Sequence, residues 1–225
     1  MSFSNTKFSP VEAIKNARRI ADHAVSLGIE DRETKGHSNR IVSYHLGAVL
    51  ADSVLQAGLN YHTVVRPRVK RILEIYPDTD KMSSVMLIIK ENKAAEFLDW
   101  NHHEKVSRFV EVVNFLNASS IQNVCDLRDH LQEDRCRNDL LGITGIGPKT
   151  VDYLSCLVGL DCIAVDRHVK LFVENAGLEI KGYDSLKLVV SYAADLLGIA
   201  RRDFDSWMWS FMSSQRRSNA QYQLL

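Results

Sequence analysis

The sequence predicts an all-α protein, and three observations support this. Apolar residues recur at helical spacing along most of the 225-residue chain, whereas few segments alternate apolar and polar residues as strands do. Glycine and proline are scarce, at 11 and 4 residues, so they rarely interrupt this spacing. With 45% hydrophobic and 25% charged residues, the composition is that of a folded globular protein rather than a disordered chain.

The predicted helices are recognised by an apolar stripe. Phe109, Val110, Val113 and Leu116 follow Val106 at positions three, four, seven and ten, which lie on one helical face. Comparable patterns predict further helices over residues 10–27, 42–54, 63–76, 83–98, 121–135, 148–158, 167–176, 186–197 and 203–213. The polar segment 28–40 predicts a loop.

The length allows one substantial domain or two small lobes, at about 150 residues per domain. The sequence has no repeat of fixed period and no linker rich in proline, serine or glycine. We therefore expect two lobes that share a core rather than two tethered domains.

Charge, cysteine content and hydropathy exclude several function classes. No apolar run approaches the ~20 residues that span a bilayer, and the N-terminus lacks a secretory signal pattern, so we expect an intracellular protein without a membrane partner. Four cysteines without a CxxC pair indicate reduced thiols. A formal net charge of zero argues against a uniformly basic surface, and the basic run 66–71 is interpreted as a solvated helix face.

The most informative segment is residues 140–151, LLGITGIGPKTV. Gly145 and Gly147 can adopt positive φ and allow close backbone approach, and Pro148 suits the first position of a helix. Unpaired N–H groups at such a helix start bind phosphate, because the positive end of the helix dipole lies there. Taken alone, the turn is equally typical of an ordinary connection between helices.

A second motif, AVDRHV at residues 164–169, places Asp166 17 residues after Lys149. Together, the two motifs resemble the helix-hairpin-helix DNA glycosylase superfamily, which includes endonuclease III and the 8-oxoguanine glycosylases. The resemblance is strongest over residues 142–172 and extends, more weakly, over 40–212.

Two weaker similarities lie in the same order along the chain. Leu55-Gln56-Ala57 resembles the segment whose side chain fills the gap left by a flipped base. Residues 205–209, DSWMW, resemble the final helix of the 8-oxoguanine branch. That branch is therefore slightly favoured, while oxidised pyrimidines and alkylated bases stay open as substrates.

The resemblance implies a two-lobed helical glycosylase fold with the active site in the cleft between the lobes. Within a single unit of residues 1–225, it implies a helical-bundle lobe at about 45–142, which carries the segment that fills the gap. The helix-hairpin-helix would lie at about 143–159. Residues 1–44 and 160–225 would form the second lobe.

The resemblance also implies a DNA N-glycosylase with AP lyase activity that acts as a monomer on damaged double-stranded DNA. Lys149 would be the nucleophile, and Asp166 would stabilise the positive charge that develops on the sugar. A lysine with the reference pKa of ~10.4 is protonated at neutral pH, so the site must favour the neutral amine. The dipole of the following helix and burial beneath a flipped base both act in that direction.

Further contacts are implied for residues around these two. The DNA backbone would be bound by the hairpin residues Gly145, Ile146, Gly147 and Thr150. Gln56 would fill the gap, and His168 would orient Asp166 or contact a phosphate. Trp209 would stack on the extruded base. Each candidate also has an ordinary explanation. Asp166 suits a helix cap, Lys149 a solvated helix surface, and Trp209 the core.

No cofactor is expected. Endonuclease III holds an iron–sulfur cluster with four C-terminal cysteines, whereas no cysteine follows Cys162 here. The basic C-terminal tail of some archaeal 8-oxoguanine enzymes is also not evident in residues 213–225. No metal ligands are assigned, and a monovalent cation held by the hairpin carbonyls stays open.

Two other function classes stay open. A non-catalytic DNA-binding module would use the hairpin for phosphate contacts only, but it would not require a lysine at this spacing from an aspartate. A helical protein-interaction domain predicts no salt-dependent DNA affinity. A DNA substrate implies a cytoplasmic or nucleoid location, or the nucleus of a eukaryote.

Overall fold

The computed structural model describes residues 9–30 and 44–222, with side chains as far as Gln215. Within these ranges the regular structure is helical, without strands, which confirms the predicted all-α class. The chain divides into two compact units: residues 1–39 with 161–225, and the continuous segment 40–160. We call them the terminal unit and the middle unit after their places in the sequence. The predicted loop at 28–40 lies largely outside the described residues.

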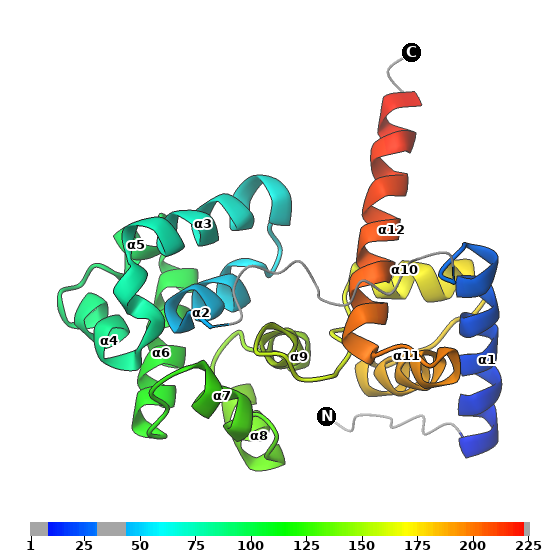
Figure 1. The fold of residues 1–225 in the computed structure, drawn as a ribbon, viewed down its shortest axis with the longest axis horizontal. Helices are drawn as coiled ribbons and strands as arrows, with labels where there is room; N and C mark the ends of the chain where they lie inside the picture. The colour runs from blue at the N-terminus through cyan, green and yellow to red at the C-terminus, as the bar shows by residue number, and fades with distance from the viewer. Residues whose placement is uncertain (1–8, 31–43, 223–225) are drawn as a thin grey trace. The chain divides into compact units, whose positions relative to one another are not determined.

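The middle unit is built around α2 (Leu46–Leu55), in which every residue is buried. Its sequence is apolar on most sides, as in a helix that others surround, and it packs on α3, α6 and α9 (Figure 1). The remaining α-helices of this unit are α3 (Arg66–Ile75), α4 (Met82–Lys90), α5 (Ala94–Leu98), α6 (His103–Ala118), α7 (Val124–His130), α8 (Asp134–Leu141) and α9 (Pro148–Leu157).

Three predicted helices are divided or begin differently in the structure, and the predicted helix 203–213 is part of a longer helix, Arg201–Tyr222. The predicted helix 83–98 is two helices, because Asn92 adopts a left-handed φ of 56°. The predicted helix 121–135 is divided between α7 and α8, and its first part starts at Val124, where Asn123 caps the helix. The predicted helix 63–76 starts with a π-helical turn (Tyr61–Val65), because Pro67 has no N–H and its ring crowds the preceding turn.

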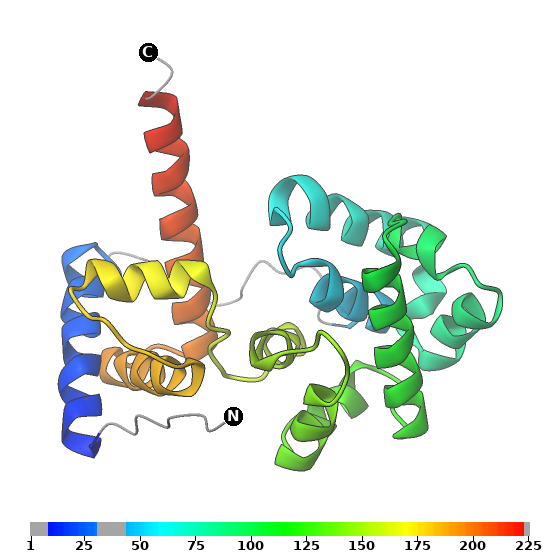
Figure 2. The same cartoon turned by 180° about the vertical axis from the view of Figure 1, so that it is seen from behind.

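The terminal unit consists of two packed helix pairs. α1 (Pro10–Ser26) packs on α11 (Tyr183–Leu197), and α10 (Arg167–Asn175) packs on α12 (Arg201–Tyr222) (Figures 1 and 2). Small residues on the buried face of α1 allow close helix approach: Ala13, Ala17, Ala21 and Ala24. The Trp207 ring lies in the core of this unit, 5.6 Å from the Phe172 ring between centroids.

A buried ion pair joins the helices on either side of the glycine turn. The Asp152 carboxylate on α9 has a side chain only 2% exposed and pairs with the Arg137 guanidinium on α8. The same guanidinium donates from Nη1 to the Ser155 hydroxyl at 3.0 Å. A buried carboxylate that loses its cation is strongly destabilising, so this pair holds α8 against α9.

Arg137→Met should lower the free energy of unfolding by about 3 kcal/mol, because it removes the charge that compensates Asp152. Arg135→Met on the same helix is the matched control. The Arg135 side chain is 91% exposed, and its ion pair with Asp139 is long, at 3.9 Å. That variant should change stability by less than about 1 kcal/mol. Equal losses in urea unfolding would show that the buried pair has no special role.

Candidate active site

The glycine motif forms a hairpin between α8 and α9, with its turn at residues 142–147. Gly145 has to be glycine for two reasons. Its φ is +82°, and a Cβ atom there would overlap the Arg108 guanidinium. Nε of Arg108 also donates to the carbonyl of Thr144 at 3.3 Å, so α6 holds the tip of the hairpin.

Gly147 differs from Gly145. Positive φ, which the sequence allows at both glycines, occurs only at Gly145; Gly147 is extended, with φ −105° and ψ 174°. A Cβ atom at Gly147 would meet nothing within 4 Å. The N–H groups of both glycines donate to no acceptor within the described part of the chain. The start of α9 therefore has an open surface lined by backbone amides.

The other two hairpin candidates are buried. Ile146 and Thr150 are each 7% exposed, and the Thr150 N–H donates to the Gly147 carbonyl at 2.9 Å. Their side chains pack inside the middle unit. A DNA contact by either residue would have to come from its backbone.

Lys149 lies in the first turn of α9 and contacts the end of α2. Its Nζ donates to Oε1 of Gln56 at 2.9 Å, and both side chains are partly buried. Gln56 is the C-cap residue of α2, and its Nε2 is buried with no hydrogen-bond partner among the described residues. The structure thus brings together two candidates that are 93 residues apart in the sequence.

A second lysine, which no sequence motif marks, lies at the same helix end. Nζ of Lys105 on α6 donates to three carbonyls: those of Val54 at 3.0 Å, Leu55 at 3.2 Å and Ala57 at 2.8 Å. Burial is the main cause that lowers the pKa of Lys105 to about 8. A lysine on a helix surface is too common for sequence reasoning to single out.

The terminal unit holds the other candidates. Asp166 is the N-cap of α10, as expected of an aspartate before a helix: its Oδ1 accepts from the N–H groups of His168 at 2.7 Å and Val169 at 3.0 Å. Its Oδ2 lies 3.0 Å from Nδ1 of His168. The His168 ring is buried and meets the partly buried Trp209 edge to face, 6.0 Å apart between centroids. Asp166, His168 and Trp209 therefore form one cluster.

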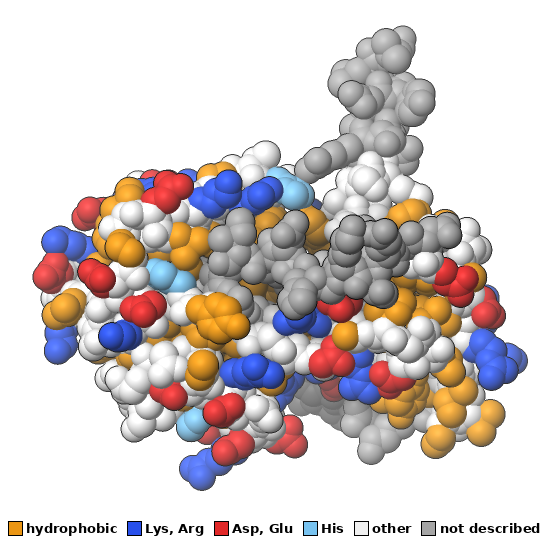
Figure 3. Space-filling view, viewed as in Figure 1, with side chains coloured by type: hydrophobic (Ala, Val, Ile, Leu, Met, Phe, Trp, Pro, Cys, Tyr) orange, Lys and Arg blue, Asp and Glu red, His pale blue; other side chains and the backbone are white. Residues whose placement is uncertain are grey.

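The basic run 66–71 is partly used to cap another helix. Arg68 donates from Nε to the Asp99 carbonyl at 2.9 Å, and Arg71 donates from Nη1 to the Glu96 carbonyl at 3.1 Å, both at the end of α5. Figure 3 shows Lys and Arg side chains interspersed with Asp and Glu side chains on the face that it displays. These two arginines are better explained as helix caps than as part of a nucleic-acid patch.

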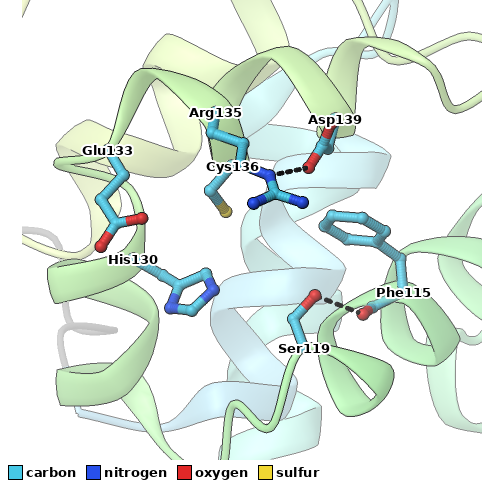
Figure 4. A pocket seen from close by; sticks show the side chains of 7 residues that line it. All are labelled: Phe115, Ser119, His130, Glu133, Arg135, Cys136 and Asp139. Carbon is cyan, nitrogen blue, oxygen red and sulfur yellow. Dashed lines mark hydrogen bonds and ion pairs between the residues drawn. The ribbon is translucent and has the colours of Figure 1, made fainter.

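A pocket of about 220 Å³ in the middle unit contains none of the candidate residues (Figure 4). Its lining includes His130, Glu133 and Cys136. Burial raises the pKa of the Cys136 thiol, which disfavours a nucleophilic thiolate. Among the residues with described placement, no three His, Cys, Asp or Glu side chains gather as a metal site would require. No described helix is long and apolar enough to cross a bilayer.

A family model described as "Domain of unknown function (DUF8548)" matches residues 65–213, well over half of the chain. The chain belongs to the DUF8548 family. The region matched by the DUF8548 model includes Lys149, Asp166 and Trp209 but starts after Gln56. No curated protein and no solved structure matches the chain.

In this DUF8548 protein, Gly145→Ala should reduce stability by about 1–2 kcal/mol, because alanine at positive φ is strained. Displacement of Arg108 would add to this loss. Gly147→Ala should change stability by less than about 0.5 kcal/mol, since its backbone is extended and its surroundings are open. Thermal unfolding monitored by circular dichroism compares the two variants. A loss at Gly147 as large as that at Gly145 would contradict the geometry of the hairpin.

Proposed function

We propose that the protein is a helix-hairpin-helix DNA glycosylase that removes a damaged base from double-stranded DNA and then cleaves the abasic strand. The contact between Lys149 and Gln56 carries the proposal. The reaction needs a nucleophile at the sugar of a flipped nucleotide and a side chain to fill the vacated space. The two residues that suit these roles are hydrogen-bonded to each other in the middle unit. The two-lobed arrangement, with the active site between the lobes, is part of the proposal.

The proposed reaction begins when the neutral Lys149 amine attacks C1′ of the flipped nucleotide. The N-glycosidic bond breaks, and the base leaves with the bonding electrons and takes up a proton. The sugar ring opens to a Schiff base between Nζ and C1′. Loss of a C2′ proton then expels the 3′ phosphate, and water hydrolyses the Schiff base to restore the lysine.

Asp166 is proposed to stabilise the positive charge that develops on the sugar. Two backbone N–H groups and the His168 ring hold its carboxylate before substrate binds, so little reorganisation is needed during the reaction. Trp209, whose ring meets the His168 ring edge to face, is proposed to stack on the extruded base. Similarity to the 8-oxoguanine branch makes 8-oxoguanine the favoured substrate.

The hairpin is proposed to bind DNA phosphates through the amides at Gly145 and Gly147, which donate to no acceptor among the described residues. The surroundings of Gly147 are open, and the Arg108 guanidinium lies beside Gly145. Such contacts position a protein on DNA but do not read its sequence.

Gly147→Val should therefore weaken binding to damaged and undamaged duplexes about equally, because it covers the amides without disturbing the fold. Fluorescence anisotropy at several salt concentrations measures this effect, and wild-type affinity should fall as salt rises. A loss restricted to one lesion would place Gly147 in the base pocket instead.

The experiment that tests the proposed function is borohydride trapping. The protein is incubated with duplexes that carry one 8-oxoguanine, one oxidised pyrimidine, one alkylated base or one abasic site, with an undamaged duplex as control. Borohydride reduces a Schiff base to a stable crosslink, so a crosslink is expected on the abasic duplex and on at least one lesion. Salt-sensitive binding without a crosslink on any duplex would support the non-catalytic DNA-binding module.

Lys149→Gln should abolish the crosslink and strand cleavage while duplex affinity is largely retained, because the hairpin amides remain. Asp166→Asn should slow base release by about 100-fold, since it removes a stabilising charge. Asparagine is an equally good N-cap, so the melting temperature of this variant should stay close to that of the wild type. The control is Lys170→Gln, at an exposed lysine on α10. Trapping by Lys149→Gln at the wild-type rate would show that another amine reacts.

A further inference from the structure

We propose that Lys105 is a positioning residue for Lys149: it fastens the end of α2 that carries Gln56, and its positive charge favours the neutral, nucleophilic form of the Lys149 amine. This inference rests on the proposed function and concerns how the proposed nucleophile is oriented and made reactive.

The hydrogen bonds of Lys105 hold the C-terminal end of α2 in place. An ammonium group has three N–H donors, and Nζ of Lys105 has three carbonyl acceptors at 2.8–3.2 Å. The carbonyls of Leu55 and Ala57 lie on either side of Gln56, so the backbone is held on both sides of that residue. A positive charge is also favourable at the C-terminal end of a helix dipole.

The fastened segment orients Lys149. The backbone of Gln56 is held through the adjacent carbonyls of Leu55 and Ala57, which accept hydrogen bonds from Lys105. Oε1 of Gln56 in turn accepts the hydrogen bond from Nζ of Lys149 at 2.9 Å. The position of the amine therefore depends on Lys105 through the end of α2. Loss of the Lys105 ammonium would release the segment whose side chain orients the nucleophile.

The charge of Lys105 acts on Lys149 directly. Burial, then Arg108 and Lys149, lower the pKa of Lys105 to about 8, while Glu104 opposes them. Arg108 and Glu104 lie on the same helix as Lys105, Lys149 lies on α9, and α2 contributes the carbonyls. Because repulsion between two positive charges is mutual, protonated Lys105 disfavours protonation of Lys149.

The titration of Lys105 adds a pH dependence. Below about pH 8 the ammonium group donates to all three carbonyls and repels a second positive charge. Above that pH, a neutral amine has only two N–H donors for three carbonyls, so the segment that orients Lys149 is held less firmly. The trapping rate should rise with pH as Lys149 loses its proton and then fall above about pH 8, because the Lys149 amine is less well positioned.

The first experiment measures the Lys149 amine without DNA. Lysines are acetylated with limiting acetic anhydride between pH 6 and 11, and mass spectrometry quantifies the peptide that contains Lys149. Lys105→Met should lower the reactivity of Lys149 at pH 7 by about three- to ten-fold, because one repelling charge is lost. Lys105→Arg should retain it.

Arg71→Met is the matched control, because Arg71 fastens another helix end through the carbonyls of Glu96 and Phe97. This variant should also leave the reactivity of Lys149 unchanged. Unchanged reactivity in Lys105→Met would overturn the electrostatic part of the inference.

The second experiment repeats borohydride trapping on an abasic duplex. Lys105→Met should lower the trapping rate at saturating DNA with little change in the DNA concentration that gives half of that rate, and Lys105→Arg should restore most of the rate. If Lys105→Met does not fold, Lys105→Arg decides the question: its guanidinium stays charged, so the fall above about pH 8 should vanish. Persistence of that fall, or a crosslink that maps to Lys105, would overturn the inference.

The two experiments separate this inference from the proposed function. If the wild-type protein forms no crosslink on any duplex, the proposed function is refuted. Acetylation would still show whether Lys105 changes the reactivity of the Lys149 amine. Trapping by the wild type with unchanged acetylation and unchanged trapping in Lys105→Met would refute the inference alone.

Discussion

The end of α2 is enclosed by neighbouring helices, so its last carbonyl groups have to find hydrogen-bond donors within the protein. Lys105 supplies these donors from α6. One turn further along the same helix, Arg108 holds the tip of the hairpin. A single helix therefore sets two parts of the candidate site: the segment that contains Gln56 and the glycine turn before Lys149. The need to satisfy buried backbone acceptors brings these parts together.

The same use of positive charge recurs across the middle unit. Arg68, Arg71, Lys105 and Arg108 all donate to main-chain carbonyls, so these four cations stabilise helix ends and turns. If the protein binds DNA as proposed, neutral amides contribute a large share of the contacts. The lysine and arginine side chains would still release counterions on binding, so affinity would fall as salt rises.

Helical periodicity was sufficient to predict the all-α fold class, because each helix has one apolar stripe that faces a core. It could not locate the break at Asn92, since buried residues such as Val85 and Phe97 occur on both sides of it. The cap at Asp166 was predictable because its hydrogen bonds are local. Lys105 was not, because its acceptors lie about 50 residues away and no motif encodes such a contact.

The terminal unit combines an N-terminal helix with helices that follow residue 160, whereas the middle unit is one continuous segment. During synthesis on the ribosome, the middle unit can complete its core while the last third of the chain is still missing. α1, however, leaves the ribosome long before α11, the helix against which its alanine face packs. That face stays in water, or in contact with a chaperone, until more than 150 further residues have been made. Slow synthesis of the C-terminal third would therefore prolong the exposure of the apolar face of α1 more than that of any other helix.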